Sequence, residues 1–409
     1  MTLYTSFSLL IVISALFAYI NHRFIKLPPS IGLMLLALLT SFAVISVGIV
    51  LPDVTKDIKA ILQSIDFSEL LMGSMLSFML FAGAIHIKIA LLKQEKFSII
   101  IFSTFSVVIS TFIIGIGIYY LLGLFSVHTN FIYCLLFGSL ISPTDPIAVL
   151  GILKQAKIPK SLEMKMAGES LFNDGVAVVV FLTILHVAQI PENIQFSEVV
   201  ILFLREAVGG IILGFAIGYI GFVLMRSIDN YKVEVLITLA VVMGGYSLAN
   251  LLHISGPLAM VVAGIIIGSH GKKFAMSETT IEYIDKFWEM IDETLNAILF
   301  VLIGLELLVI QFLPTYIITG LITIILVLVT RYISVFLPAQ IIKLKEKITH
   351  RTIIIMTWGG LRGGISIALA LSLKPEMQKD IWVTLTYFVV AFSILVQGLT
   401  VGKLARRIK

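Results

Sequence analysis

The sequence predicts an all-α membrane protein, and two features carry that prediction. Only 13% of the 409 residues are charged and 59% are hydrophobic, whereas soluble domains average about 25% charged residues. The hydrophobic residues also gather in long runs, and a helix needs about 20 largely apolar residues to cross a bilayer. This composition excludes a soluble enzyme, a nucleic-acid-binding protein and a disordered scaffold.

Thirteen segments are long and apolar enough to be transmembrane helices, and prolines or charged residues separate most of them. The predicted spans are residues 3–21, 31–50, 67–87, 97–124, 130–152, 162–189, 198–226, 232–251, 255–270, 283–309, 314–341, 352–372 and 381–403. Residues 1–197 then hold six spans, residues 198–230 the seventh, and residues 231–409 six more. The first span lacks the basic start and small-residue cleavage site of a signal peptide, so we expect it to stay in the membrane.

Basic residues sort by side when the C-terminus is placed in the cytoplasm. The cytoplasmic loops and tail then hold 21 of the 29 lysines and arginines, and the outside loops hold 4. Cytoplasmic loops of membrane proteins are enriched in these residues, and an odd number of spans puts the N-terminus outside. Of the four basic residues within spans, Arg205 and Lys286 lie near segment ends. Arg331 and Arg362 lie deep, where a charge normally marks a functional site or an ion pair.

The fifth span contains the run Ser142-Pro143-Thr144-Asp145-Pro146. Proline lacks an amide proton and clashes with the preceding turn, so we expect the helix to break here. Broken backbone at membrane depth must face protein or a water-filled cavity. The freed backbone groups and Asp145 can then serve an ion, although a simple proline kink is the alternative.

The sixth span contains the run Gly168-Glu169-Ser170-Leu171-Phe172-Asn173-Asp174-Gly175. Glu169 and Asn173 are one turn apart, as are Ser170 and Asp174, so all four share one broad helix face. Their oxygen atoms suit a hard cation, and a carboxylate in a low-dielectric surrounding takes up a proton more readily than in water. One site can therefore hold either a cation or a proton, and a structural hydrogen-bond network is the alternative.

The twelfth span contains the run Trp358-Gly359-Gly360-Leu361-Arg362-Gly363-Gly364. Its four glycines favour an unwound turn, and this break falls at the same place in its repeat as the break in the fifth span. Corresponding breaks in two halves indicate a secondary transporter built from inverted repeats, with its site where the breaks meet. We expect Asp145 and Arg362 to offset the half-helix ends there. Glycine-mediated packing beside an arginine that reaches the interface is the alternative.

The eleventh span contains Arg331, which needs a buried partner. Glu169 is the best candidate, because Asp174 must stay free in order to titrate. A pairing of Glu169 with Arg362 instead is equally open on the sequence.

Three weaker features remain. The tenth span carries a polar stripe that would either line a cytoplasmic cation funnel or face solvent, formed by Glu289, Asp292, Glu293 and Asn296. The seventh span carries a glycine ridge suited to helix packing, at Gly210, Gly214 and Gly218. Four further residues stand apart from these motifs in the sequence, and we expect them to have a structural role only: His86, His186, His253 and Cys134.

Together these motifs resemble the monovalent cation/proton antiporters of the NhaP/NHE type. The resemblance extends to Leu27-Pro28-Pro29-Ser30-Ile31-Gly32 and His253-Ile254-Ser255-Gly256, so it covers nearly the whole chain. It implies thirteen helices in two inverted six-helix repeats, with crossed, discontinuous helices 5 and 12. It also implies a homodimer in which a core transport domain, about residues 97–197 and 310–409, moves against a dimerisation domain formed by the remainder.

The resemblance also implies roles for individual residues. Asp174 would bind the exchanged ion, with Thr144 and Ser170 as further oxygen ligands for Na⁺, Li⁺ or K⁺. Asp145 and Asn173 would organise the crossing and the site. Glu169 would pair with Arg331. An Asn-Asp pair is similar to the electroneutral branch, which exchanges one proton for one cation. The chain departs from many bacterial relatives in the third span, where Phe81-Ala82-Gly83-Ala84-Ile85-His86 carries no acidic residue.

The function expected from the sequence is exchange of Na⁺ or Li⁺ for a proton by alternating access, with K⁺ as an alternative. We expect a prokaryotic cytoplasmic membrane with its lipids as the surroundings, and no cofactor, enzymatic activity or nucleic-acid partner. A gated cation channel is a rival, because it would also use polar groups in the membrane, but it would conduct without moving protons. A membrane enzyme would need a nucleophile–base pair or a metal cluster, and an organic-anion symporter would need further basic groups.

Overall fold

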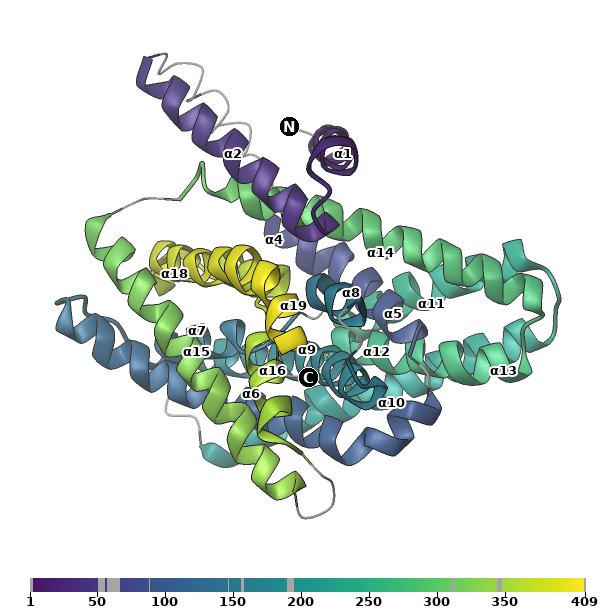
Figure 1. The fold of residues 1–409 in the computed structure, drawn as a ribbon. Helices are drawn as coiled ribbons and strands as arrows, with labels where there is room; N and C mark the ends of the chain where they lie inside the picture. The colour runs from purple at the N-terminus through teal and green to yellow at the C-terminus, as the bar shows by residue number, and fades with distance from the viewer. Residues whose placement is uncertain are drawn as a thin grey trace.

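The computed structural model is an all-α protein (Figure 1). It describes residues 3–50, 56, 67–87, 89–145, 147–155, 158–189, 195–310, 313–343 and 348–407. Its α-helices are α1 (Leu3–Ile20), α2 (Pro29–Val50), α4 (Phe67–Leu70), α5 (Leu76–Ile85), α6 (Ile89–Leu124), α7 (Phe131–Ile141), α8 (Ile147–Gln155), α9 (Lys160–Gln189), α10 (Phe196–Arg226), α11 (Tyr231–Leu252), α12 (Gly256–Ile266), α13 (Lys272–Phe274), α14 (Glu278–Glu306), α15 (Pro314–Ile342), α16 (His350–Trp358), α17 (Gly364–Leu371), α18 (Lys379–Phe392) and α19 (Gly398–Arg407). Shorter helical turns are η1 (Asn21–Ile25), η2 (Leu71–Met75), η3 (Ile267–Gly271), η4 (Pro375–Met377) and η5 (Ser393–Gln397). Pro146 of the fifth-span motif lies outside the described residues, as do the loop residues Lys59, Lys88, Lys157, Lys345, Lys347 and Lys409.

Eight helices among the described residues are long and apolar enough to cross a membrane. They cover Phe7–Ile25, Pro29–Gly48, Leu92–Leu124, Lys160–Gln189, Ser197–Arg226, Tyr231–Leu252, Pro314–Ile342 and Lys379–Arg407. Two shorter apolar helices, α5 and α7, belong to other predicted spans. The all-α membrane class is thereby confirmed, while the count of thirteen spans and the inverted repeat stay predictions.

Several helices begin at a polar N-cap residue, whose position does not depend on where the apolar run starts. At the starts of α11, α12, α14 and α16 a side-chain oxygen accepts a hydrogen bond from the backbone amide two or three residues later. The accepting residues are Asn230, Ser255, Ser277 and Thr349. Such caps satisfy amide groups that have no partner within the helix. They explain why these helices begin where they do.

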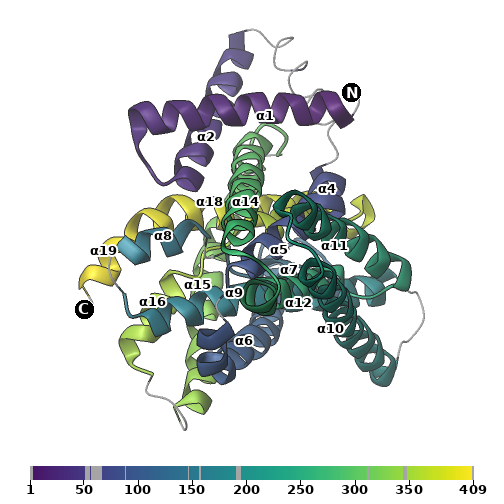
Figure 2. The same cartoon turned by 90° about the vertical axis from the view of Figure 1, so that its right-hand side faces the viewer.

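The glycine ridge of the seventh span packs α10 against α12. A methyl group on Gly214 would come within 2.4 Å of the Ala259 carbonyl oxygen, and one on Gly218 within 2.9 Å of Ala263 Cα. Close backbone approach of this kind requires small residues. At one edge of the molecule, α1 and α2 pack on α14 (Figure 2).

Two helices are interrupted in mid-course, as the sequence predicts. The first interruption separates α7 from α8 and the second separates α16 from α17. The Asp145 amide donates to the Leu361 carbonyl oxygen at 2.7 Å, and the two residues form an isolated antiparallel bridge. The two interrupted segments therefore meet at their breaks, and this crossing positions the site.

Candidate functional site

The crossing brings each charge to a half-helix end of opposite polarity. Arg362 Nη1 donates to the carbonyl oxygens of Ser142 and Pro143, the latter at 3.0 Å, just past the C-terminus of α7. Asp145 lies at the N-terminus of α17, where a methyl group on Gly363 would come within 2.5 Å of Asp145 Oδ2. Helix C-termini favour cations and N-termini favour anions. The two charges thus offset the two half-helix ends, and the close approach requires glycine at position 363.

Two side chains of α9 hold Thr144 within the first break. Ser170 Oγ donates to the Thr144 carbonyl oxygen. Asn173 Nδ2 donates to Thr144 Oγ1 at 2.9 Å, and the Thr144 amide donates to Asn173 Oδ1 at 3.4 Å. All three residues are buried. Because an amide side chain both donates and accepts, Asn173 donates to the Thr144 hydroxyl and accepts from the Thr144 amide at the same time.

Glu169 forms a buried ion pair with Arg331. Arg331 Nη1 lies 2.6 Å from Glu169 Oε1, and the two side chains are only 4% and 2% exposed. Arg331 Nη2 also donates to the Met356 carbonyl oxygen at 3.2 Å. Of the two arginines that the sequence offers to Glu169, the structure pairs it with Arg331.

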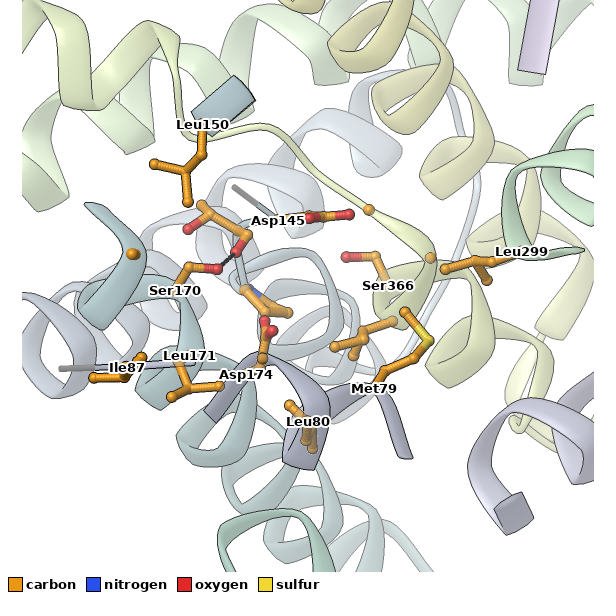
Figure 3. A pocket seen from close by; sticks show the side chains of 17 residues that line it. Met79, Leu80, Ile87, Asp145, Leu150, Ser170, Leu171, Asp174, Leu299 and Ser366 are labelled. Atoms are coloured by element: carbon orange, nitrogen blue, oxygen red, sulfur yellow. Dashed lines mark hydrogen bonds between the residues drawn. The ribbon is translucent and has the colours of Figure 1, made fainter. Parts of the chain in front are cut away.

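Asp174 faces a cavity of about 140 Å³ beside the crossing. Thr144, Asp145, Ser170 and Ser366 line the same cavity, and Figure 3 shows Asp145, Ser170 and Asp174 directed toward this space. No hydrogen bond or ion pair joins the Asp174 carboxylate to another of the described residues. Asp174 therefore faces the cavity together with Asp145, and its carboxylate has no hydrogen-bond or ion-pair partner among the described residues.

Apolar side chains form the rest of the cavity wall. They include Met79, Leu80, Ile87, Leu150, Leu171, Leu299 and Ile365. Charges interact strongly in such a surrounding, and an ionised group there is unfavourable unless it is compensated. Carboxylate, hydroxyl and carbonyl oxygens are the groups that replace the hydration shell of an alkali ion. The arrangement can therefore bind either a monovalent cation or a proton at Asp174.

Several residues of the site carry no signal in the sequence. Ser366 lies two residues past the glycine-rich motif and lines the cavity. Ser393 Oγ accepts a hydrogen bond from the Arg362 amide at 2.9 Å and donates to Gln397 Oε1 at 2.8 Å. Ser393 and Gln397 belong to the last predicted span, where one serine and one glutamine among apolar residues do not stand out.

His86 is not isolated, contrary to the expectation from the sequence. Its Nδ1 lies 3.4 Å from Asp285 Oδ1, which also accepts a hydrogen bond from Lys272 Nζ. The sequence could not show this cluster, because His86 directly follows α5 whereas Lys272 lies in α13 and Asp285 in α14. Cys134 is a buried free thiol, as expected.

The chain is similar to known transport proteins along almost its whole length. Residues 11–407 match the family described as sodium/hydrogen exchanger, transmembrane. The chain is 50% identical over 404 residues to the Na(+)/H(+) antiporter NhaP of Pseudomonas aeruginosa, covering 97% of this chain and 95% of that protein. It is 32% identical to the Na(+)/H(+) antiporter NhaH of Halobacillus dabanensis, covering 94% of this chain and 93% of that protein.

A solved structure shows the same fold. The sodium proton antiporter MjNhaP1 from Methanocaldococcus jannaschii at pH 8 matches with a TM-score of 0.79 at 20% identity, covering 100% of this chain and 99% of that one. The family match and the two full-length relatives together decide the classification. The chain belongs to the sodium/hydrogen exchanger family.

Proposed function

We propose that the protein is a secondary-active antiporter that exchanges one monovalent cation for one proton, with Asp174 binding each in turn. One observation carries the proposal: Asp174 opens onto the cavity without a partner among the described residues, while Glu169 and the two deep arginines each have one. Glu169 is paired with Arg331, and Arg362 donates to two backbone carbonyls. The relatives named as Na(+)/H(+) antiporters support the same exchange.

Electrostatics supplies the coupling. An empty, ionised Asp174 would carry an uncompensated charge through a low-dielectric barrier, which is strongly unfavourable. Movement is therefore favoured only when a cation or a proton neutralises this carboxylate. Because Glu169 stays neutralised by Arg331, one carboxylate changes charge in each half-cycle, and the exchange is one-for-one and electroneutral.

Na⁺ or Li⁺ is the proposed cation, with K⁺ as the alternative, because all three use the same oxygen ligands. Thr144, Ser170 and Asn173 provide or position these oxygens around Asp174, and Asp145 adds a second negative charge beside the site. In this proposal residues 97–197 and 310–409 form the moving core, and the remainder forms the dimerisation domain of a homodimer. The N-terminus lies outside a prokaryotic cytoplasmic membrane and the C-terminus lies in the cytoplasm.

The test is Asp174→Asn in proteoliposomes that contain a pH-sensitive dye. We expect cation-driven proton movement to be lost while the variant still purifies as a monodisperse, folded protein. Asp229→Asn makes the same chemical change at an exposed position and should exchange like the wild type. Full exchange by Asp174→Asn would refute the assignment.

Two further measurements on the wild type complete the test. Titrating the dye response with Na⁺, Li⁺ and K⁺ identifies the cation. An exchange rate that changes when a membrane potential is imposed would contradict one-for-one stoichiometry, and a current without proton movement would indicate a channel.

A further inference from the structure

Two side chains of the last predicted span replace a hydrogen bond that the second break has lost. In a continuous α-helix each amide donates to the carbonyl oxygen four residues earlier, so the Arg362 amide would donate to Trp358. The Arg362 amide donates instead to Ser393 Oγ at 2.9 Å. Ser393 Oγ donates to Gln397 Oε1 at 2.8 Å, and Gln397 Nε2 donates to the Trp358 carbonyl oxygen at 3.1 Å. Three bonds, here called the Ser393–Gln397 chain, thus join the two groups that one helical bond would join.

The two ends of the Ser393–Gln397 chain fix the direction of every bond in it. A carbonyl oxygen can only accept and a backbone amide can only donate. The Trp358 carbonyl therefore takes the NH₂ group of Gln397, which leaves Gln397 Oε1 to accept from Ser393. The Ser393 hydroxyl gives its one proton to Gln397 and uses a lone pair to accept from the Arg362 amide. Each of the two side chains must therefore both donate and accept.

Burial makes these bonds important for the break. Ser393 and Gln397 are 0% and 3% exposed, and an amide or carbonyl group without a partner at membrane depth is unfavourable. Both residues lie in the turn η5, where the Gly398 amide donates to the Ser393 carbonyl oxygen five residues earlier. Wide turns of this kind occur frequently at functional sites. The last predicted span therefore departs from regular helix at the point where it contacts the break.

The first break is completed in the same way. The Thr144 amide donates to Asn173 Oδ1, and Asn173 belongs to α9, the helix that follows this break in the chain. The turn η5 likewise lies in the helical segment that follows the second break. In each case the next segment supplies the acceptor that an interrupted helix lacks. The correspondence indicates that Ser393 and Gln397 serve the second break as Asn173 serves the first.

We infer that Ser393 and Gln397 are positioning residues for the exchange, because they hold the second break open. An open break leaves the Leu361 carbonyl oxygen free to accept from the Asp145 amide at 2.7 Å. In a continuous helix that carbonyl would point along the axis toward the amide four residues later, and it would leave Asp145. The inference rests on the proposed exchange and assigns to it two residues that do not line the cavity of Asp174.

The side chain of Arg362 depends on the same open backbone. Its Nη1 donates to the carbonyl oxygens of Ser142 and Pro143, directly before Thr144. Closing the helix would rotate Arg362 about the axis and withdraw it from these carbonyls. Loss of the Ser393–Gln397 chain should therefore disturb the first break as well, although neither of its side chains contacts that break.

The first experiment compares Ser393→Thr with Ser393→Val in proteoliposomes that contain a pH-sensitive dye, at equal amounts of folded protein. Threonine and valine have nearly the same shape, so both fill the site alike and only the hydroxyl differs. We expect Ser393→Thr to retain exchange. Ser393→Val should lower kcat about ten- to hundredfold, because displacing a group of the site by about 1 Å can cost that much. Equal rates for the two variants, whether high or low, would refute the inference.

The second experiment breaks the Ser393–Gln397 chain at its other residue. Gln397→Met removes the amide group at similar length and should slow exchange by a similar factor. Ser393→Val/Gln397→Met should be no slower than the slower single variant, because residues that act as a unit are not additive. Gln340→Met makes the same chemical change at an exposed position of α15 and should exchange like the wild type. Factors that multiply in the double variant would show two independent roles and contradict the inference.

The outcomes separate the two proposals. If the wild type shows no cation-dependent proton movement, the proposed exchange fails. If the wild type exchanges and Ser393→Val keeps pace with Ser393→Thr, only the positioning role is refuted. Should Ser393→Val fail to fold, Gln397→Met decides, since exchange as fast as that of Gln340→Met contradicts the inference.

Discussion

Removing Arg331 alone would leave the Glu169 carboxylate buried without its partner. The two side chains are 4% and 2% exposed, and 2.6 Å separates Arg331 Nη1 from Glu169 Oε1, so water cannot replace the lost contact. Breaking a buried ion pair by deleting one member costs about 3–5 kcal/mol, whereas replacing both members with apolar residues of similar volume is often neutral. We expect Arg331→Met to lower the free energy of unfolding by about 3–5 kcal/mol. The double variant Glu169→Leu/Arg331→Met should recover most of that loss.

An exposed ion pair of equal length provides the control. Lys286 Nζ lies 2.6 Å from Glu282 Oε1, but these side chains are 66% and 64% exposed. Water and salt screen such a pair, so Lys286→Met should have no measurable effect. Unfolding of the purified variants by sodium dodecyl sulfate in mixed micelles, followed by circular dichroism, measures the difference. The reasoning is wrong if Arg331→Met is no less stable than Lys286→Met. It is also wrong if the losses in free energy of unfolding caused by Glu169→Leu alone and Arg331→Met alone simply add in the double variant.

Two further predictions concern the crossing itself. A methyl group at Gly363 would meet Asp145 Oδ2 at 2.5 Å, so Gly363→Ala should lower the free energy of unfolding by about 1–3 kcal/mol, as overpacking does, and slow exchange in vesicles. Gly151→Ala has open space around it and should be neutral; equal effects of the two would contradict the packing argument. Asn173→Ala leaves two buried groups of Thr144 without partners. It should therefore lower the free energy of unfolding by about 1–3 kcal/mol in the same assay and raise the KM for the cation. An unchanged KM would show that Asn173 does not hold Thr144 in place for the ion.

Hydropathy locates helices well where the apolar run and the helix end at the same residue. The predicted span 314–341 agrees with α15, which runs from Pro314 to Ile342. The two agree because a proline starts that helix and polar residues follow it. The apolar run predicts that the fourth span begins at residue 97, yet α6 begins at Ile89. Its first turns include Lys93 and Lys96, which are good helix formers but lie outside any apolar window. Hydropathy therefore reports the membrane-embedded part of a helix rather than the helix.

The breaks were predictable because proline and glycine act on the local backbone. The residues that contact each other across the two breaks could be predicted only in part. Arg362 donates to the carbonyl of Ser142, 220 residues away in sequence, and no local pattern specifies which carbonyls a deep arginine will meet. Counting charges limits the partner of Glu169 to Arg331 or Arg362, because few charges lie that deep, and the structure is needed to choose Arg331. Ser366 and Ser393 are common residues in an apolar segment, and only the crossing gives them a role.

The bridge between Asp145 and Leu361 consists of backbone atoms alone. Substituting the Leu361 side chain would leave its carbonyl oxygen in place, so a side-chain scan would overlook this bond. Amide hydrogen exchange at Asp145 would reveal it instead. This bond ties the break of the first interrupted helix to the break of the second by main-chain atoms, beside the contacts of the Arg362 side chain with Ser142 and Pro143. We expect substitutions of the Arg362 side chain to leave this main-chain tie in place.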